Sequence, residues 1–197
     1  MRMIKLLGMA AVTAVAAMAL VGASSAMAES TQLCTNETGT CVEPTTVHSV
    51  TVGHAVLLSS IVNVECDALV SATVTKGLVT NGPVVLNPAT LSYSNCLNNA
   101  SVTVIKQGTI SVLNEGNELG TQTASGYRVL VEAVGLHCVY SAENLKGHAL
   151  GPLKTGTNKD HVTYSEAEVK KVEGFFCPSV SKLDALFQDL TAIWART

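Results

Sequence analysis

The sequence has few aromatic side chains and little charge. Its 197 residues include three Phe and one Trp, and charged residues make up 14% of the chain. Aromatic rings therefore cannot dominate a core, so Val, Leu, Ile and Ala must fill it. The sequence also has no cluster of Lys or Arg. This absence argues against nucleic acid and anionic membranes as partners, because both are bound through concentrated positive charge.

Motifs that carry catalysis or bind cofactors are absent as well. The sequence has no G-x-S-x-G nucleophile elbow, no phosphate loop ending in Gly-Lys-Ser/Thr and no Gly-rich dinucleotide fingerprint. Close metal-ligand pairs of the type C-x-x-C or H-E-x-x-H are missing too. The histidines are spread along the chain and are interpreted as solvent-facing: His48, His54, His137, His148 and His161. We therefore expect no catalytic residue, no metal and no cofactor.

Only one apolar run, LLGMAAVTAVAAMALV at residues 6–21, approaches the length that crosses a bilayer. Two basic residues precede it and the small-residue pattern AMA follows it, as in secretory signal peptides. We predict that residues 1–28 form a bacterial signal peptide that is cleaved before Glu29. An uncleaved membrane anchor is the alternative. No transmembrane segment is expected after cleavage, so the mature protein would be secreted or lie on the exterior of the cell envelope.

Residues 29–197 have the length of a single domain. Without the two basic residues of the signal segment, ten basic residues face fifteen acidic ones, so the mature chain is acidic.

All of the cysteines lie in this mature part: Cys34, Cys41, Cys66, Cys96, Cys138 and Cys177. An even number of cysteines in an exported chain indicates disulfides, although six cysteines allow about 15 pairings. Order along the chain suggests Cys34–Cys41, Cys66–Cys96 and Cys138–Cys177 as the simplest set.

Apolar residues occupy every second position from Val62 to Val74, and mostly polar residues fill the alternate positions. This period of two predicts a strand with one buried face, on which Cys66 points inward. Shorter runs show the same period at 46–52, 84–86, 90–93, 101–105, 109–113, 127–140 and 161–171. Gly and Asn turn signals separate them, including Gly151-Pro152 and the stretch at 155–158. The spacing is typical of an all-β sandwich or barrel, and we predict a disulfide-stapled antiparallel β-sandwich.

The C-terminal stretch SKLDALFQDLTAIW, residues 181–194, has two interpretations. Its apolar residues have helical spacing, and Ser181 could cap a helix. As a strand, it places Leu183, Ala185 and Phe187 on one face. The last element is therefore predicted as either a final strand or a short helix.

The stretch GLHCVY, residues 135–140, sets a histidine beside a cysteine. On a strand, His137 and Cys138 project to opposite faces, so they cannot form a nucleophile and base pair or bind one metal. We interpret Cys138 as a core residue placed to bond to Cys177 across strands. Glu166 and Glu168 share another strand face and could form an acid pair, but Lys170 beyond them favours a solvated face.

Resemblance to known proteins rests mainly on the tail of the chain. The succession GLHCVY, LGPLKTG and VKKVEGFFCPSVSKLDALF resembles the closing half of a large group of exported bacterial proteins of uncharacterised function. The stretches CTNETGTC, IVNVECDALVSATVT and LSYSNC match the cysteine layout of that group. The group ends in an alternating W-x-A-x-Y strand, which implies a strand here, with departures at Leu186, Asp189 and Leu190. The layout is also faintly similar to exported activators of alkane oxidation.

The function expected from the sequence is that of an exported structural or binding module rather than an enzyme. The alternative is a secreted hydrolase or metal-dependent enzyme whose site is built from loops. The loops at Asn95–Asn99 and Ala142–His148 are the candidate binding surface. A cell-envelope component or a polysaccharide is the partner class to test first, and the sequence gives no oligomeric state.

Overall fold

The computed structural model describes residues 30–116, 119–150 and 160–196, and within them the chain forms strands and no helix. The predicted signal peptide and the turn signals at 151–158 lie outside the described residues. The strands are β1 (Thr31–Cys34), β2 (Thr46–Thr51), β3 (Ala55–Leu58), β4 (Val64–Val74), β5 (Leu78–Val79), β6 (Val84–Ser94), β7 (Ser101–Lys106), β8 (Gly108–Gly116), β9 (Leu119–Ser125), β10 (Tyr127–Ala133), β11 (Leu136–Ala142), β12 (Leu145–Leu150), β13 (His161–Glu173), β14 (Val180–Asp189) and β15 (Trp194–Arg196).

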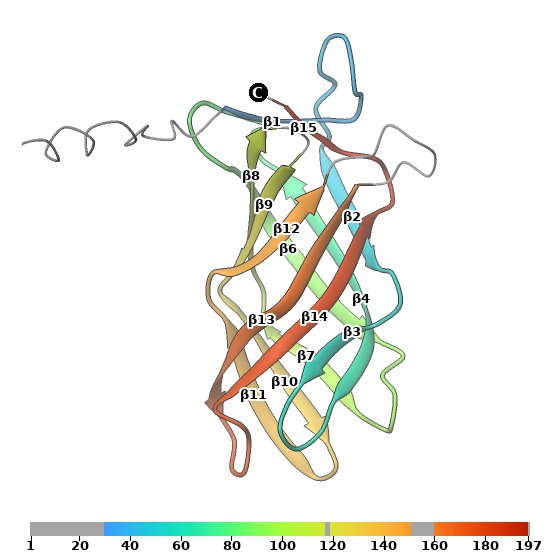
Figure 1. Ribbon diagram of the computed structural model, residues 1–197, viewed down its shortest axis with the longest axis vertical. Coiled ribbons are helices and arrows are strands. Elements are labelled where there is room, and N and C mark those ends of the chain that lie inside the picture. Colours follow the sequence, from blue (N-terminus) through green and yellow to red (C-terminus); the bar gives the residue numbers. More distant parts are fainter. Residues whose placement is uncertain (1–29, 117–118, 151–159, 197) are drawn as a thin grey trace, which may run out of the picture.

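The main sheet closes into an antiparallel barrel of eight strand positions (Figure 1). Strands β4, β6, β13 and β14 each fill one position. The other four positions are each filled by two consecutive strands with a bend between them: β2 with β3, β7 with β8, β9 with β10, and β11 with β12. Neighbours around the barrel are neighbours in sequence. The fold is therefore an up-and-down barrel, closed where β14 and β4 both pair with β2 and β3.

The predicted β-sandwich is wrong, although the all-β class and the antiparallel pairing are confirmed. An alternating pattern shows that one face of each strand is buried, and this is equally true of a sandwich and a barrel. The sheet closes into a barrel because its last strand, β14, pairs with β2, for example Phe187 with Thr51. That pairing joins segments far apart in sequence, which periodicity does not report.

The alternation in β4 works as predicted. Val64, Cys66, Ala68 and Ala72 are buried inside the barrel, while the residues between them are half-buried or exposed. The end of the chain after Cys177 forms the strand β14, so the strand alternative is confirmed and the helix alternative is wrong.

One place in the barrel wall is joined by a side chain. Below Ala89, β6 has no backbone partner on the β7 side. The Gln107 side-chain amide sits in this gap, where its Oε1 accepts from Leu91 N at 2.8 Å and its Nε2 donates to Leu91 O at 3.1 Å. The wall is thereby continued across the bend between β7 and β8.

A small sheet of β15, β1 and β5 covers one end of the barrel, the upper end in Figure 1. Thr31 of β1 is fully buried, and its Oγ1 accepts a hydrogen bond from Asn114 N of β8 at 3.0 Å. The opposite, lower end carries the turns β3–β4, β6–β7, β10–β11 and β13–β14. No helix in the described part of the chain has the length and hydropathy needed to cross a membrane.

Candidate functional site

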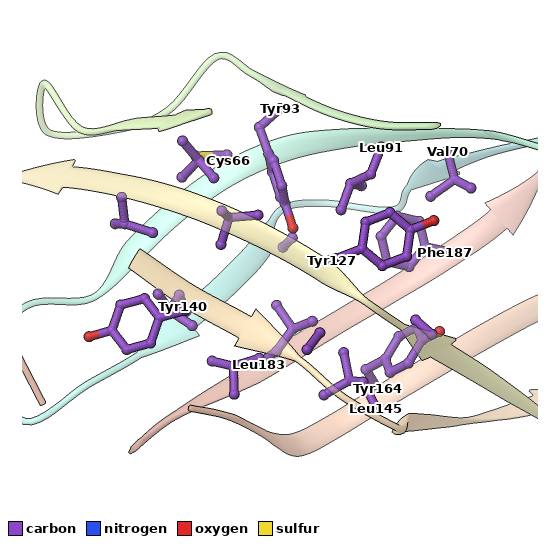
Figure 2. A pocket seen from close by; sticks show the side chains of 18 of the residues that line it. Cys66, Val70, Leu91, Tyr93, Tyr127, Tyr140, Leu145, Tyr164, Leu183 and Phe187 are labelled. Atoms are coloured by element: carbon purple, nitrogen blue, oxygen red, sulfur yellow. The ribbon is translucent and has the colours of Figure 1, made fainter. Parts of the chain in front are cut away.

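Two of the cavities inside the described part of the barrel are candidate ligand sites. A barrel of eight strands has an interior that side chains nearly fill, leaving room for at most one small ligand. The first cavity, of about 90 Å³, is central and almost wholly apolar. All of the tyrosines in the sequence line it: Tyr93, Tyr127, Tyr140 and Tyr164 (Figure 2).

These tyrosines belong to the packing of the interior. Tyr127 Oη donates to the carbonyl of Ala89 at 3.0 Å, and the Tyr164 ring packs edge-on against Phe187 with centroids 6.1 Å apart. Burial raises the pKa of Tyr93 and of Tyr127 to about 12, so both remain neutral at physiological pH. The central cavity is smaller than the roughly 150 Å³ that holds a benzene ring. It is therefore a packing space rather than a ligand site.

The second cavity, of about 290 Å³, lies at the upper end beneath the small sheet. Its size is close to the lower limit of about 300 Å³ for small-molecule pockets. Most of its wall is apolar and includes Leu33 of β1, Trp194 of β15 and Ile193. We call this space the upper cavity.

Two neighbouring carboxyl groups line the upper cavity, those of Asp160, which is buried, and Asp189, which is half-buried. Asp160 directly precedes β13 and Asp189 ends β14, and the pairing of His161 with Gln188 places the two aspartates next to each other. The backbone confirms this, since Asp189 N donates to Asp160 O at 3.3 Å. Ser49 Oγ donates to Asp189 from the neighbouring strand β2.

Burial, together with a side-chain hydrogen bond to Asp189 and the like charge of Asp189, raises the pKa of Asp160 to about 9. Burial also raises the pKa of Asp189, while its hydrogen bonds from Asp160 and Ser49 oppose the rise. The pair therefore retains a proton at neutral pH. Asp160 is only 8% exposed, and within the described residues its Oδ1 has no hydrogen-bond partner. A buried acceptor without a donor lowers the stability of the fold unless a ligand or water donates a hydrogen bond to it.

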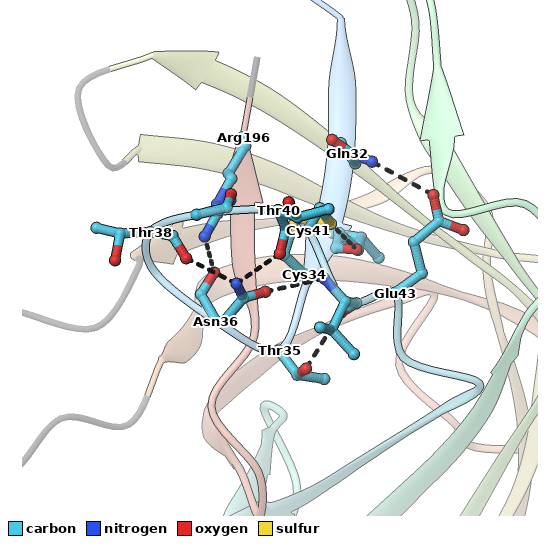
Figure 3. The surroundings of a disulfide bond; sticks show 12 residues. Gln32, Cys34, Thr35, Asn36, Thr38, Thr40, Cys41, Glu43 and Arg196 are labelled. Carbon is cyan, nitrogen blue, oxygen red and sulfur yellow. Dashed lines mark hydrogen bonds between the residues drawn. A yellow bond between two sulfur atoms is a disulfide. The ribbon is translucent and has the colours of Figure 1, made fainter.

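The upper cavity is covered on one side by the loop that the Cys34–Cys41 disulfide closes. Glu37 and Thr38 of this loop line the cavity. Arg196 of β15 fastens the loop, because its guanidinium donates to the carbonyls of Gly39, at 3.0 Å, and Asn36 (Figure 3). We call residues 34–41 the lid.

A polar layer separates the two cavities. Gln122 of β9 lines both of them, and its Oε1 accepts a hydrogen bond from Tyr164 Oη at 2.7 Å. Ser49 lines the central cavity while bonding to Asp189 of the upper one. Gln122 and Ser49 thus form a polar layer at the floor of the upper cavity.

The cysteines form the three disulfides expected from their order: Cys34–Cys41, Cys66–Cys96 and Cys138–Cys177. All six cysteines are therefore paired, and no thiol is free. His137 is exposed on the face opposite the buried Cys138, as the strand interpretation of GLHCVY predicts. Its Nδ1 lies 2.8 Å from Glu132 Oε1.

The two predicted binding loops have other roles in the structure. Asn95 Nδ2 donates to Asp67 Oδ2 at 2.7 Å, and Cys96 bonds to Cys66, so the loop at 95–99 is tied to the barrel wall. Donation from Asn95 lowers the pKa of Asp67. The prediction of a loop at 142–148 is wrong for its second half, because residues from Leu145 onward form β12.

The remaining predicted candidates do not converge. Glu166 and Glu168 are exposed on the barrel exterior, and Glu166 pairs with Lys182 at 2.9 Å. Within the ranges 30–116, 119–150 and 160–196, no group of three or more His, Cys, Asp or Glu side chains could hold a metal ion.

Sequence reasoning missed Asp160 and Asp189. They are 29 positions apart and look like isolated surface acids. Only the register of the β13–β14 pairing brings them together. The one available signal was that each carboxylate stands at the same end of two consecutive strands.

Comparison with known proteins adds no relative to this description: no family model, no curated protein and no solved structure matches the chain. The resemblance to exported bacterial proteins therefore stays a prediction.

Proposed function

We propose that the protein is an extracytoplasmic binding module that holds one small, mostly apolar molecule bearing an amine in the upper cavity. The single observation that carries this proposal is the Asp160–Asp189 pair, with a buried acceptor oxygen that no described residue completes. Buried ionisable groups with strongly shifted pKa values in a cavity are characteristic of functional sites.

The charges around the upper cavity support an amine as the polar group of the ligand. Three carboxyl groups line it, those of Glu37, Asp160 and Asp189, and no Lys or Arg among the described residues does. An ammonium group donates hydrogen bonds and neutralises the ionised member of the pair. The Trp194 ring in the wall also suits a cation, because its face attracts positive charge.

The apolar remainder of the wall supports a hydrocarbon body for the ligand. Leu33, Ile193 and Trp194 would contact it, and burying a CH₂ group contributes about 0.8 kcal/mol. The three disulfides, which leave no cysteine free, support a site of action outside the cytoplasm.

The hydrolase alternative draws on the same pair of carboxyls. Two adjacent carboxyls that share a proton can act as general acid and base. Ligand binding is favoured because the pair lies under a lid fastened by a disulfide and Arg196, which leaves little room for a substrate larger than the cavity. Turnover of a hydrolysable amide or ester that depends on Asp160 would favour the enzyme instead.

The test compares hexylamine, hexanol and hexanoate, which share a hydrocarbon body and differ in their polar group. We expect hexylamine to bind most tightly by isothermal titration calorimetry at pH 8, hexanol more weakly and hexanoate not at all. The variant Asp189→Asn should lower the hexylamine affinity at least about tenfold, because it removes the ionised member of the pair and hydrogen bonds to charged groups contribute about 1.5–3 kcal/mol.

The matched control is Glu168→Gln, which removes an exposed carboxyl on the outside of the barrel and should leave the affinity unchanged. Equal binding of hexanoate and hexylamine, or full affinity in Asp189→Asn, would contradict the proposal.

A further inference from the structure

The most exposed apolar side chains of the described residues gather at the lower end of the barrel. Phe175 is 90% exposed, Phe176 86% and Val134 80%, whereas other exposed large apolar residues do not exceed 59%. Val134 lies in the β10–β11 turn, and the two phenylalanines lie in the β13–β14 loop (Figure 1). We call these three residues the apolar prong.

The two hairpin ends that carry the apolar prong are locked together. Cys177, next to Phe176, is bonded to Cys138 of β11. Gly174, with φ +116, packs so closely on β11 that an added Cβ would lie 2.4 Å from His137 O. The two turns are therefore held together on a fixed support, while the three side chains stay 80–90% exposed.

The backbone conformation at the apolar prong shows that folding does not account for these residues. Val134 has φ 49 and Phe176 has φ 59, in the left-handed region that is unfavourable for branched and bulky side chains. Among the described residues, the other non-glycine positions with positive φ are Glu166 and five asparagines: Asn81, Asn95, Asn98, Asn99 and Asn144. Large apolar residues at two strained and exposed positions do not favour local stability, which points to a role for their side chains outside the fold.

The charge pattern around the apolar prong identifies the kind of surface that it fits. Residues 133–136 (AVGL) and 174–180 (GFFCPSV) contain no charged residue. Behind them lies a collar of mixed charge, which includes Glu132, His137, Lys171 and Glu173. An uncharged apolar tip without an excess of positive charge behind it matches the interface of a bilayer of zwitterionic lipid, because anionic lipid selects a positive excess.

A lipid layer also fits the shape better than a folded partner does. The three side chains come from two separate turns, whereas a contiguous apolar patch with a polar rim is usual for protein interfaces. A deformable layer accepts such projections without a matching pocket. From these observations we infer that the apolar prong inserts into the interfacial region of a zwitterionic lipid bilayer and holds the barrel on its surface by the lower end.

The first test is flotation of the disulfide-bonded protein with phosphatidylcholine vesicles. We expect the wild type to float with the vesicles and the double variant Val134→Asn/Phe176→Asn to lose at least about tenfold in partition, given the transfer free energy of these side chains. The same double variant should melt at an equal or higher temperature, because Asn tolerates positive φ. Loss of binding with retained stability separates insertion from a structural role.

The matched control is Val42→Asn, which removes a 59% exposed apolar side chain from the region of the lid at the other end of the molecule. It should float like the wild type. A second readout is the variant Phe175→Trp in vesicles of brominated phosphatidylcholine. Its added Trp should be quenched, while the native Trp194 at the upper end should not be.

Failure of the wild type to float, or unchanged flotation of the double variant, would overturn the inference. So would a concentration-dependent dimer that the double variant abolishes, because the occupant of the apolar prong would then be a second copy of the chain. Hexylamine binding in the upper cavity is measured separately, so neither result depends on the other.

Discussion

At the scale of single residues, position in the barrel decides what each side chain does. Asp67 and Asp160 are both aspartates, yet a hydrogen bond from Asn95 lowers the pKa of the first and burial raises the pKa of the second. His137 and Cys138 are adjacent, but one is exposed and the other is bonded inside. The residue types are readable from the sequence, whereas their surroundings come from the barrel.

The raised pKa of Asp160 predicts how stability depends on pH. The folded protein keeps a proton on Asp160 up to about pH 9, while the unfolded chain releases it above about pH 4. The unfolded state therefore binds fewer protons in this window. The free energy of unfolding should fall as pH rises from about 4 to 9, by up to about 1.4 kcal/mol per pH unit.

Asp160→Asn should make this pH dependence shallower and raise stability at pH 8, because a neutral amide replaces a group that must stay protonated. Urea unfolding at several pH values measures the effect. Glu37 and His161, which line the same cavity, are present in both proteins. A difference between the two slopes is therefore due to Asp160. An identical slope in wild type and variant would show that Asp160 is not the group responsible.

Individual elements were predictable to the extent that their inward residues are apolar. The strand β4 was readable because Val64, Cys66 and Ala68 alternate with polar neighbours. The strands β9 and β12 were missed because small or polar residues occupy inward positions, such as Gly120, Gln122 and Gly147. Gly147 faces the Tyr164 ring, and an added Cβ would lie 2.9 Å from it. The Tyr164 ring of β13 thus fills the space that an apolar side chain of β12 would occupy. The sequence of β12 therefore lacks the alternation that predicts a strand.

Gly108, the first residue of β8 after the bend, should tolerate no side chain. A Cβ at Gly108 would lie 2.1 Å from Ser125 O and 2.6 Å from Tyr127 Cδ2. We expect Gly108→Ala to lower the free energy of unfolding by about 1–3 kcal/mol, as overpacking does. At Gly82 the nearest atom to an added Cβ is 3.5 Å away, so Gly82→Ala is the control and should change stability little. Equal effects in thermal unfolding would contradict this account of the bend.

The two disulfides that close long segments should stabilise the barrel most. Cys66–Cys96 and Cys138–Cys177 span 30 and 39 positions, against 7 for Cys34–Cys41. In the loop-entropy model, replacing either long pair with Ala costs about 3.5–4 kcal/mol, and replacing the short pair costs about 2 kcal/mol. Denaturant unfolding of the three double variants measures the order, and a larger loss from the short pair would be inconsistent with it.

On the scale of the whole molecule, closure of the barrel creates the features that the sequence did not reveal. Closure sets the β13–β14 register beside β2, which brings Ser49 to the Asp160–Asp189 pair. It also gives the molecule two different ends, with a covered acidic cavity at one and the apolar prong at the other. If the apolar prong rests on lipid, the lid faces away from that surface, and the upper cavity is open to ligands from solution.

The lid then predicts a separation between binding and stability. The Cys34–Cys41 pair and Arg196 hold Glu37 and Thr38 over the upper cavity, but the lid lies outside the barrel ladder. The variant Cys34→Ala/Cys41→Ala should therefore bind hexylamine with a faster dissociation rate and at least about tenfold lower affinity, because the loop must be ordered on binding. The barrel itself should remain folded, with the smallest stability loss of the three disulfide variants.

The variant Cys66→Ala/Cys96→Ala serves as the opposite case, since it should lose more stability and keep the affinity of its folded fraction. Stopped-flow dissociation and calorimetry on both variants measure the two quantities, and equal losses of affinity would show that the lid does not control the upper cavity.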